Sequence, residues 1–234
     1  MREYKGVIQY SDGSYFEGHF SQGRMEGKGR KVFAELEVYE GDFSHNQPHG
    51  QGKCSYSTDA YYEGDWKEGK QEGMGVEVVI GVQRFEGEFK AGQKNGKGIC
   101  KWNDGAVYEG EFVDGKHEGQ GKYVWANGKS YTGSWKEGKE HGEGVLSFTT
   151  GKVYTGEFVA GVQQGKGKLV WYEESVLIDY RQDQTYEGFW VNGKEEGRFT
   201  ISAPEKEPKM VEMQAGKIIS IIDTPAAATN VPVQ

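Results

Sequence analysis

The chain repeats a short alternation of aromatic and polar positions, of the form aromatic-x-Gly-x-aromatic. In residues 108–112 (YEGEF), the rings and the glycine occupy alternate positions with carboxylates between them. Successive side chains of a β-strand point to opposite faces, so this pattern predicts a strand with one aromatic and one acidic face. The motif begins at residues 16, 39, 62, 85, 108, 131, 154 and 186. The first seven starts are 23 residues apart, which indicates an internal repeat of that length.

The rest of each repeat predicts a turn and a second strand. With the motif start as position zero, glycine fills position seven in seven of the eight repeats and position eleven in all of them. We expect positive φ angles there, and Asn46, the exception at position seven, tolerates such angles better than most residues. A second strand is expected from Gly121 through Tyr123 and Trp125, followed by a tight turn at residues 127–128 (NG). Each repeat is therefore predicted to be a β-hairpin.

Successive hairpins predict an all-β fold, an elongated single-layer antiparallel meander of about eight 23-residue repeats. The array is expected to cover residues 1–202, with a partial repeat before residue 16 and nine inserted residues around 173–185. Glycine at position two lies between two rings, and we expect a ring from a neighbouring strand to fill the gap. Residues 203–234 contain four of the five prolines and are expected to form an extended C-terminal tail.

Composition narrows the class of protein. Thirty-seven glycines together with 13% aromatic residues fit neither a helical domain nor a flexible linker. A net charge of -8 argues against a nucleic-acid partner, whose binding normally needs a basic surface. Residues 1–10 lack the apolar stretch of a signal peptide, and no window approaches the roughly 20 apolar residues that span a bilayer. We therefore expect a soluble, cytoplasmic protein.

Few side chains suggest chemistry. Carboxylates such as Glu40 and Asp42 recur by register, so we expect a solvated polar face and no catalytic, cofactor-binding or metal site. His45, His49 and Cys54 have a zinc-like composition, but other repeats lack the group and no fourth ligand is apparent. Cys54 and Cys100 both occupy position fifteen, two repeats and on the order of 19 Å apart. Because a disulfide needs Cα atoms within about 7 Å, we expect free thiols.

The 21-residue pattern of residues 108–128 resembles the MORN repeat (membrane occupation and recognition nexus), and the resemblance covers residues 4–202. Phe199, which replaces a glycine at position thirteen of the last repeat, departs from it. The resemblance implies a non-catalytic scaffold in a ciliary or flagellar axoneme, such as a radial spoke, or in a cortical cytoskeleton. Its partners would be other proteins of a multi-subunit assembly, including another MORN protein.

Two other functions remain as alternatives. The family name implies a membrane-associated adaptor that binds anionic phospholipids through basic residues at positions eight and twelve. Glutamates at position ten of the same turns offset the positive charge of these basic residues, so a lipid partner is not favoured. MORN repeats also accompany catalytic domains as accessory modules of enzymes, but too few residues lie outside the array for such a domain.

Aromatic rows and two apolar segments are the candidate contacts for a partner. The rows at positions zero, four and seventeen are expected to form the core of a thin sheet, with partly exposed rings along a groove for an extended peptide. The insertion and the apolar run of residues 217–222 interrupt the repeat, and the run is expected to add to a sheet edge of this chain or of a partner. The candidate residues are Trp66, Trp102, Trp125, Trp135, Trp171, Trp190, Val176, Leu177, Ile178, Ile218, Ile219, Ile221 and Ile222.

Overall fold

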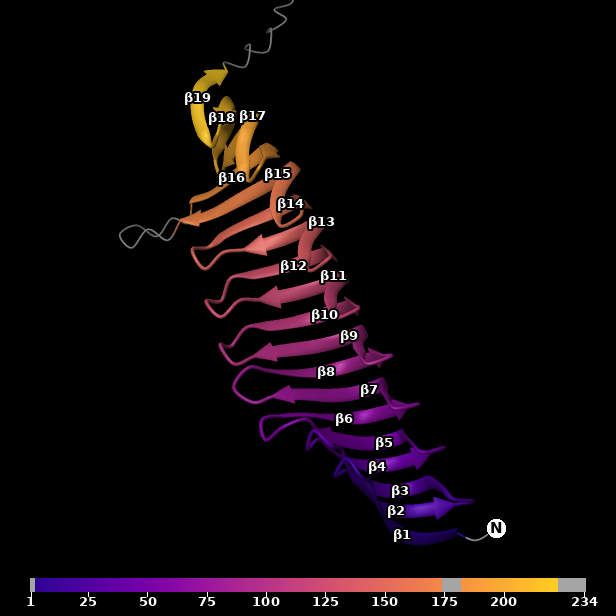
Figure 1. Ribbon diagram of the computed structural model, residues 1–234. Coiled ribbons are helices and arrows are strands. Elements are labelled where there is room, and N and C mark those ends of the chain that lie inside the picture. Colours follow the sequence, from indigo (N-terminus) through magenta and orange to yellow (C-terminus); the bar gives the residue numbers. More distant parts are fainter. Residues whose placement is uncertain (1–2, 174–181, 223–234) are drawn as a thin grey trace, which may run out of the picture. The chain divides into compact units, whose positions relative to one another are not determined.

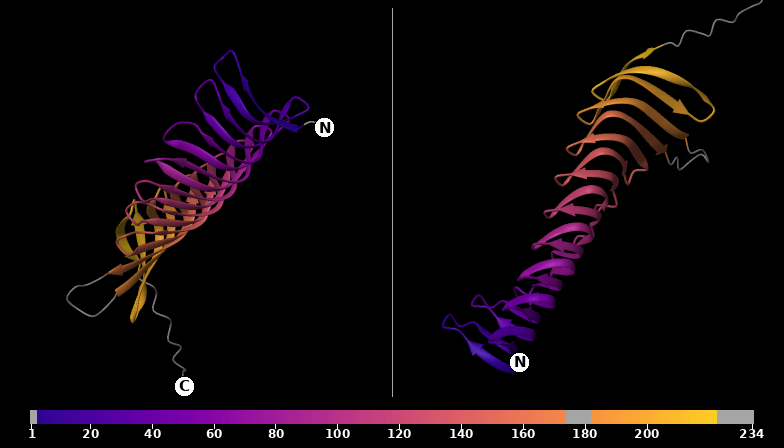
Figure 2. Two further views of the ribbon diagram at one scale, coloured as in Figure 1. Left: turned by 90° about the horizontal axis from the view of Figure 1, so that it is seen from below. Right: turned by 90° about the vertical axis from the view of Figure 1, so that its right-hand side faces the viewer.

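The computed structural model describes residues 3–173 and 182–222, and these residues form nineteen β-strands and no helix. The chain divides into two compact units, Met1–Ala126 and Asn127–Gln234. Within each unit, consecutive strands follow one another in a single layer (Figures 1 and 2), and each pairs antiparallel with the next. The prediction of an all-β antiparallel meander of hairpins is confirmed.

The first unit contains eleven strands. They are β1 (Glu3–Gln9), β2 (Tyr15–Ser21), β3 (Arg24–Val32), β4 (Val38–Ser44), β5 (Gln47–Ser55), β6 (Ala60–Lys67), β7 (Lys70–Val79), β8 (Gln83–Lys90), β9 (Gln93–Trp102), β10 (Val107–Val113) and β11 (Lys116–Val124). The second unit contains eight strands. They are β12 (Ser130–Lys136), β13 (Lys139–Ser147), β14 (Lys152–Val159), β15 (Val162–Glu173), β16 (Gln182–Val191), β17 (Lys194–Ala203), β18 (Lys206–Gln214) and β19 (Lys217–Ile222).

The two strands of a repeat are joined by a two-residue turn at positions six and seven. In the hairpin of β10 and β11, Asp114 and Gly115 have φ angles of 47° and 78°. Two central residues with positive φ define the type I′ turn that matches the twist of a hairpin. Position seven is therefore glycine or asparagine, and Asn46 has a φ of 69°. The positive φ at positions seven and eleven is confirmed, whereas the sequence did not indicate the same geometry at position six.

Position eleven lies at a β-bulge that the acidic residue at position three stabilises. The register of β4 and β5 shifts between Gly41 and Phe43, and Gly50 has a φ of 67° beside the bulge. The Asp42 carboxylate accepts a hydrogen bond from the Gln51 backbone N–H at 3.1 Å. Equivalent bonds bind Asp65, Glu88, Glu111 and Glu157 to the residue at position twelve of their own repeats. These recurring carboxylates therefore have a structural role.

The ring at position zero lies over the glycine pair of its own hairpin. Gly41 and Gly52 are directly opposite each other on β4 and β5, and a Cβ on Gly41 would lie 2.6 Å from the Tyr39 Oη. That hydroxyl donates a hydrogen bond to the Asp42 carbonyl at 2.9 Å, which holds the ring across both strands. The prediction that a neighbouring strand's ring fills this gap was wrong for the first seven repeats, and it holds only at Gly188 of the eighth, which the Phe199 ring of β17 covers. The gap is filled from within the repeat because the two facing glycines have no Cβ atoms, which leaves room for a ring to lie across both strands.

Neighbouring rings join the repeats edge to face. Tyr39 meets Phe43 of its own repeat at a centroid distance of 5.1 Å and Trp66 of the next repeat at the same distance, with interplanar angles of 89° and 83°. In the first unit this alternation continues from Phe16 to Phe112, and in the second from Tyr131 to Trp190. We call this row of buried rings at positions zero and four the aromatic ladder. Edge-to-face pairs contribute about 0.5–1.5 kcal/mol each beyond the area that they bury.

Backbone and side-chain hydrogen bonds also join each turn to the preceding repeat. Gly92 N–H donates to the Gln71 carbonyl at 2.9 Å, and the same bond recurs at Gly69 and Gly115. The Ala91 N–H also donates a hydrogen bond to the Glu72 carboxylate at 2.9 Å. Within each unit, neighbouring hairpins are thus joined through the ladder, through strand pairing and through the turn.

In the last repeat with the aromatic motif, a different ring covers the position-two glycine. Phe199 replaces the glycine at position thirteen, and a Cβ on Gly188 would lie 2.6 Å from the Phe199 ring. Phe199 is 1% exposed and meets Trp190 edge to face at 4.8 Å. Tyr186 is less buried, and its hydroxyl hydrogen-bonds to the Gln184 side chain at 3.1 Å. Phe199 therefore occupies the place that Tyr186 would take in an ordinary repeat.

The array continues beyond residue 203 as a ninth, degenerate hairpin. β17 pairs with β18, and β18 pairs with β19, so residues 206–222 belong to the sheet and not to an extended tail. Ala215 and Gly216 form a turn with φ angles of 49° and 80°, and Gly216 N–H bonds to the Glu195 carbonyl as in the other repeats. Met213 is 5% exposed and lies 23 residues after Trp190, the period of the array.

The ninth hairpin corrects one prediction about the tail and decides another. The boundary at residue 203 was wrong for residues 206–222 because the hairpin keeps the repeat's phase without its aromatic motif. Residues 217–222 add to the sheet of this chain, whereas the sequence left open whether they add to this sheet or to that of a partner. Residues 223–234 lie outside the described part.

Replacing Gly29 with alanine should destabilise the protein by about 1–3 kcal/mol, because the new Cβ would overlap the Phe16 ring. Gly6→Ala is a matched control at the same position of the partial repeat, where a Cβ would meet Phe20 at an ordinary 3.4 Å. Urea denaturation followed by circular dichroism measures both changes. Equal midpoints for the two variants would contradict the role given to the glycine pair.

Candidate protein-docking groove

A groove crosses the face of the first unit that carries the aromatic ladder, and its cavity volume is about 500 Å³. Its lining residues come from four successive repeats, which start at residues 16, 39, 62 and 85. Its lining residues are Lys31, Phe33, Glu37, Tyr39, Asn46, Gln47, Pro48, Cys54, Tyr56, Trp66, Gly69, Lys70, Gln71 and Gly92. We call it the aromatic groove.

Buried ladder residues form the floor of the aromatic groove. Tyr39 is fully buried and Trp66 is 7% exposed, and the indole N–H of Trp66 donates to the Gly52 carbonyl at 2.9 Å. Cys54, on β5 directly opposite Tyr39, is 4% exposed. The polar atoms of both rings are already bonded within the protein, so the floor offers an apolar surface of fixed shape.

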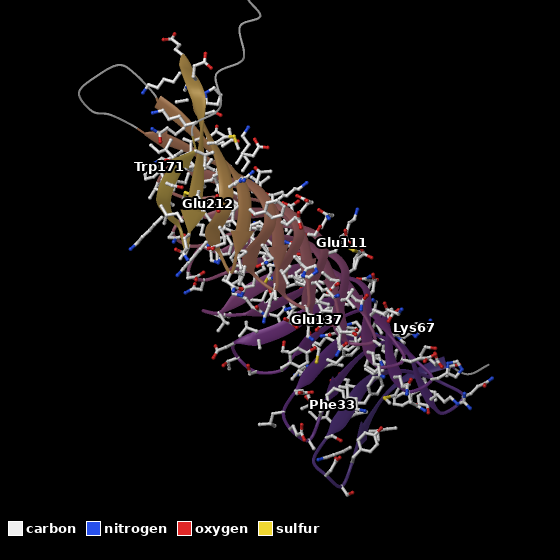
Figure 3. The ribbon with its side chains drawn as sticks, turned by 90° about the horizontal axis from the view of Figure 1, so that it is seen from above. Phe33, Lys67, Glu111, Glu137, Trp171 and Glu212 are labelled. Carbon is white, nitrogen blue, oxygen red and sulfur yellow. The ribbon has the colours of Figure 1, made fainter. Side chains whose placement is uncertain are left out.

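Position seventeen supplies the more exposed rings of the groove. Phe33, labelled in Figure 3, follows β3, and its backbone N–H bonds to the Glu37 carbonyl at 2.9 Å. Tyr56 follows β5 and makes the equivalent bond to Ala60. These residues are the first of the loops that join successive repeats, one step beyond the strands in which the sequence placed them. A ring at the start of a loop is only partly covered, which leaves area for a partner.

Residues from the turn of the following repeats complete the walls. Gln71 donates from Nε2 to the Tyr56 hydroxyl at 2.7 Å, which fixes that ring. Burial raises the pKa of the Tyr56 hydroxyl, so the ring stays neutral across the physiological range. The sequence did not single out Asn46, Pro48 or Gln71 as groove residues. Their positions seven to nine were assigned only to a turn, although that turn bonds back to the preceding repeat.

The charge around the aromatic groove is mixed. Lys31 lies over the Phe33 ring with its Nζ 4.8 Å from the centroid, and Lys70 adds a second cation. Glu37 contributes a carboxylate. The partly exposed rings of Phe33 and Tyr56 are therefore the main accessible apolar surface of the groove, and the rim around them carries both signs of charge.

The six candidate tryptophans separate into two groups. Trp66, Trp135 and Trp190 at position four are 7%, 5% and 2% exposed and belong to the ladder, so the structure removes Trp135 and Trp190 from the exposed candidates. Trp66 contributes only to the groove floor. Trp102 and Trp125 at position seventeen are partly exposed.

Trp171 is the most exposed of the six, at 37% (Figure 3). The Lys152 Nζ lies 3.6 Å from its ring centroid. The position-seventeen tryptophans remain candidates because their neighbours leave part of each ring uncovered.

Of the two apolar segments that the sequence singled out, only the run of residues 217–222 lies wholly in the described part of the chain. Ile218, Ile219 and Ile221 on β19 are 50%, 58% and 64% exposed, and Ile222 is partly exposed. They remain candidates for contact with a partner. The predicted contacts Val176, Leu177 and Ile178 lie outside the described residues.

The opposite face carries ion-paired charge. Lys28 at position twelve contacts Asp42 of the next repeat at 2.8 Å, and Arg30 contacts Glu40 at the same distance. Hydrogen bonds from Lys28 and from the Gln51 N–H outweigh partial burial and lower the pKa of Asp42. A hollow with a cavity volume of about 680 Å³ lies over the glycine pairs here, and it is lined by both signs of charge. Part of the basic row considered for lipid contact is thus already neutralised by acidic neighbours.

Within residues 3–173 and 182–222, no group of three or more His, Cys, Asp or Glu side chains could hold a metal ion. His45 instead faces Glu26, with 3.8 Å between its Nδ1 and the carboxylate. Across the same residues, the fold includes no helix with the length and hydropathy of a membrane span.

The chain was compared with models of known protein families. A family model of the MORN repeat matches residues 16–35, 39–60, 62–78, 85–107, 108–130, 131–153, 154–175 and 186–198. Each matched stretch begins at the aromatic residue of position zero. A comparison with curated proteins gave no match.

Both cysteines should resist modification in the folded protein. Cys54 and Cys100 are free and buried, and burial raises the pKa of Cys54 to about 12 and that of Cys100 above its ordinary value. At pH 9.0, the ordinary thiol pKa, we expect a maleimide to label neither residue in buffer and both in urea. Mass spectrometry of the peptides measures this, and rapid labelling of Cys54 in buffer would contradict the closed groove floor.

Proposed function

Because the chain belongs to the MORN repeat family, we propose that it is a non-catalytic scaffold that docks protein partners in a larger cytoskeletal assembly. The aromatic groove is the observation that supports this proposal most strongly. It combines a rigid apolar floor with half-covered rings and a mixed-charge rim, the combination found at centres of protein interfaces.

The proposed ligand is an extended segment of a partner protein. The groove lining comes from four successive repeats and includes the position-seventeen rings of two of them, so an extended chain could place successive apolar side chains against Phe33 and Tyr56. Binding would need little rearrangement, because hydrogen bonds already hold Tyr56 and Trp66 in place. A rigid site avoids much of the ordering cost of association.

A ciliary or flagellar axoneme, with the radial spoke as one such assembly, is the proposed location. This rests on the resemblance of long MORN arrays to axonemal components, which is an argument by analogy and weaker than one from a site. The regularity of the recurring polar residues supports the non-catalytic part of the proposal. Carboxylates at position three serve the bulge in five of the eight repeats, as Asp42 and Asp65 illustrate.

The alternative is an adaptor that binds anionic phospholipids. Basic residues at positions eight and twelve support it, but Lys28 is paired with Asp42. Sedimentation with phosphoinositide vesicles at physiological salt tests the alternative. Binding that is abolished by neutralising Lys70, Lys116 and Lys139 together would favour it over protein docking.

Removing the groove rings tests protein docking. We expect the double change Phe33→Ala and Tyr56→Ala to weaken partner binding about 10–30-fold, as truncation of aromatic anchors typically does. Partners are first identified by proximity labelling and affinity purification from ciliated cells. The purified partner is then titrated against each variant by calorimetry.

The matched control is Phe148→Ala, which removes the position-seventeen ring of a repeat in the second unit, outside the aromatic groove. It should leave the affinity unchanged, and circular dichroism should show the same β-signal for all variants. Equal affinity of the wild type and the groove variant for every partner would contradict docking in the groove. A partner set without cytoskeletal proteins would contradict the proposed location alone.

A further inference from the structure

The outer edge of β19 is apolar. The strand pairs with β18 on one side, and none of the other described strands of the second unit pairs with its other side. Ile218, Ile219 and Ile221 are at least half exposed, and Lys217 at the start of the strand is its only charged residue. Exposed sheet edges in soluble proteins normally carry charges, prolines or bulges that prevent pairing with another chain. An edge with four isoleucines in six residues is suited to pairing.

The first strand of the first unit provides a comparison. β1 likewise pairs with one neighbour, β2, but it has the sequence EYKGVIQ, in which Glu3 and Lys5 introduce charge. Its Gly6 also leaves a gap opposite Gly18. β1 therefore has protective features that β19 lacks.

A bulge gives β19 an unusual distribution of side chains. Ile221 lies opposite Val211, and Ile218 lies opposite Met213, with a register shift between them that leaves Ile219 without a directly opposite residue. Val211 and Met213 are 2% and 5% exposed and continue the buried face of the sheet. Directly opposite residues share a face. Ile218 and Ile221 therefore extend that apolar face although they are three residues apart.

We propose that β19 pairs antiparallel with β19 of a second copy of this chain across a two-fold axis perpendicular to the sheet. In the register that sets Ile218 opposite the second copy's Ile221, symmetry creates the reciprocal pair as well. All four side chains then lie on one face, next to Val211 and Met213 of each copy. Lys217 lies opposite the second copy's Ile222, at the ends of the strand.

The face distribution selects this register. Ile222 lies opposite Met210 and therefore on the other face from Ile221. A shift of one residue would set Ile218 opposite the second copy's Ile222 and join residues of different faces, which a sheet does not allow. The side-chain distribution of β19 is thus compatible with a second β19 in the antiparallel direction and in this one register.

A second copy suits this edge better in a two-fold than in a head-to-tail arrangement. Head-to-tail contact would place β1, with Glu3 and Lys5, beside the isoleucines of β19. The two-fold arrangement pairs apolar residues with apolar residues and closes on itself, so it produces a dimer and not a filament.

Light scattering coupled to size-exclusion chromatography tests the dimer on the full chain. We expect a mass approaching twice 26.1 kDa as concentration rises. Ile218→Lys combined with Ile221→Lys should give a monomer, because like charges would lie directly opposite each other. Val7→Lys, at a 65% exposed apolar residue of β1, is the matched control and should leave the dimer intact.

Charge exchange provides a readout that loss of folding cannot imitate. The variant with Ile218→Glu and Ile221→Glu should also be monomeric alone, but mixing it with the lysine variant should restore a dimer. A wild type that is monomeric at its highest soluble concentration, or a dimer unaffected by the lysine variant, would overturn the proposal.

Cysteine cross-linking tests the register directly and leaves the edge apolar. A copy with Ile218→Cys mixed with a copy with Ile221→Cys should form an intermolecular disulfide, while neither copy should cross-link with itself. Cys54 and Cys100 do not interfere, because they are buried and have raised pKa values. Cross-linking of either variant with itself, with none in the mixture, would refute this register and the two-fold pairing derived from it.

Discussion

The contact between the ring at position zero and the facing glycine pair of its own hairpin is the constraint on which the rest of the structure depends. Two strands in a sheet lie about 4.8 Å apart, and a ring can lie across both only if neither carries a Cβ beneath it. At Tyr39, facing Gly41 and Gly52 leave that space, and the Tyr39 hydroxyl bonds to the Asp42 carbonyl beyond it. The glycines at positions two and thirteen and the rings at position zero therefore form one structural feature.

Stability and binding surface both follow from how the rings meet. Within each unit, a position-zero ring such as Tyr39 touches a position-four ring of its own repeat and another of the next, so a hairpin buries its aromatic face only when its neighbours are present. The same two contacts recur at Phe16, Tyr62, Phe85, Tyr131 and Tyr154. This is the nearest-neighbour behaviour of repeat proteins. Because positions zero and four form the core, the rings of position seventeen at the loop ends remain partly exposed. Phe33 and Tyr56 thereby become available to a partner without loss of the core.

The sequence predicted the features that recur with the 23-residue repeat. The hairpins, the turn glycines and the tolerance at Asn46 all followed from local chemistry that recurs every 23 residues. It did not predict which ring fills the space above a glycine, since a pattern assigns residues to a face but not to a neighbour. The ninth hairpin was missed because Val211 and Met213 keep the phase of the repeat without its motif. The groove walls were missed because Gln71 reaches Tyr56 through packing between repeats.

A double-mutant cycle between Tyr62 and Phe89 measures the ladder most directly. These rings belong to successive repeats and meet edge to face at 4.8 Å. Each is changed to leucine alone and together, and unfolding is followed by circular dichroism and by tryptophan fluorescence. We expect a coupling free energy of about 0.5–1.5 kcal/mol, against less than about 0.5 kcal/mol for Phe16 with Phe89, which belong to non-adjacent repeats. Equal coupling in the two pairs would contradict a structure held together by rings that join neighbouring repeats.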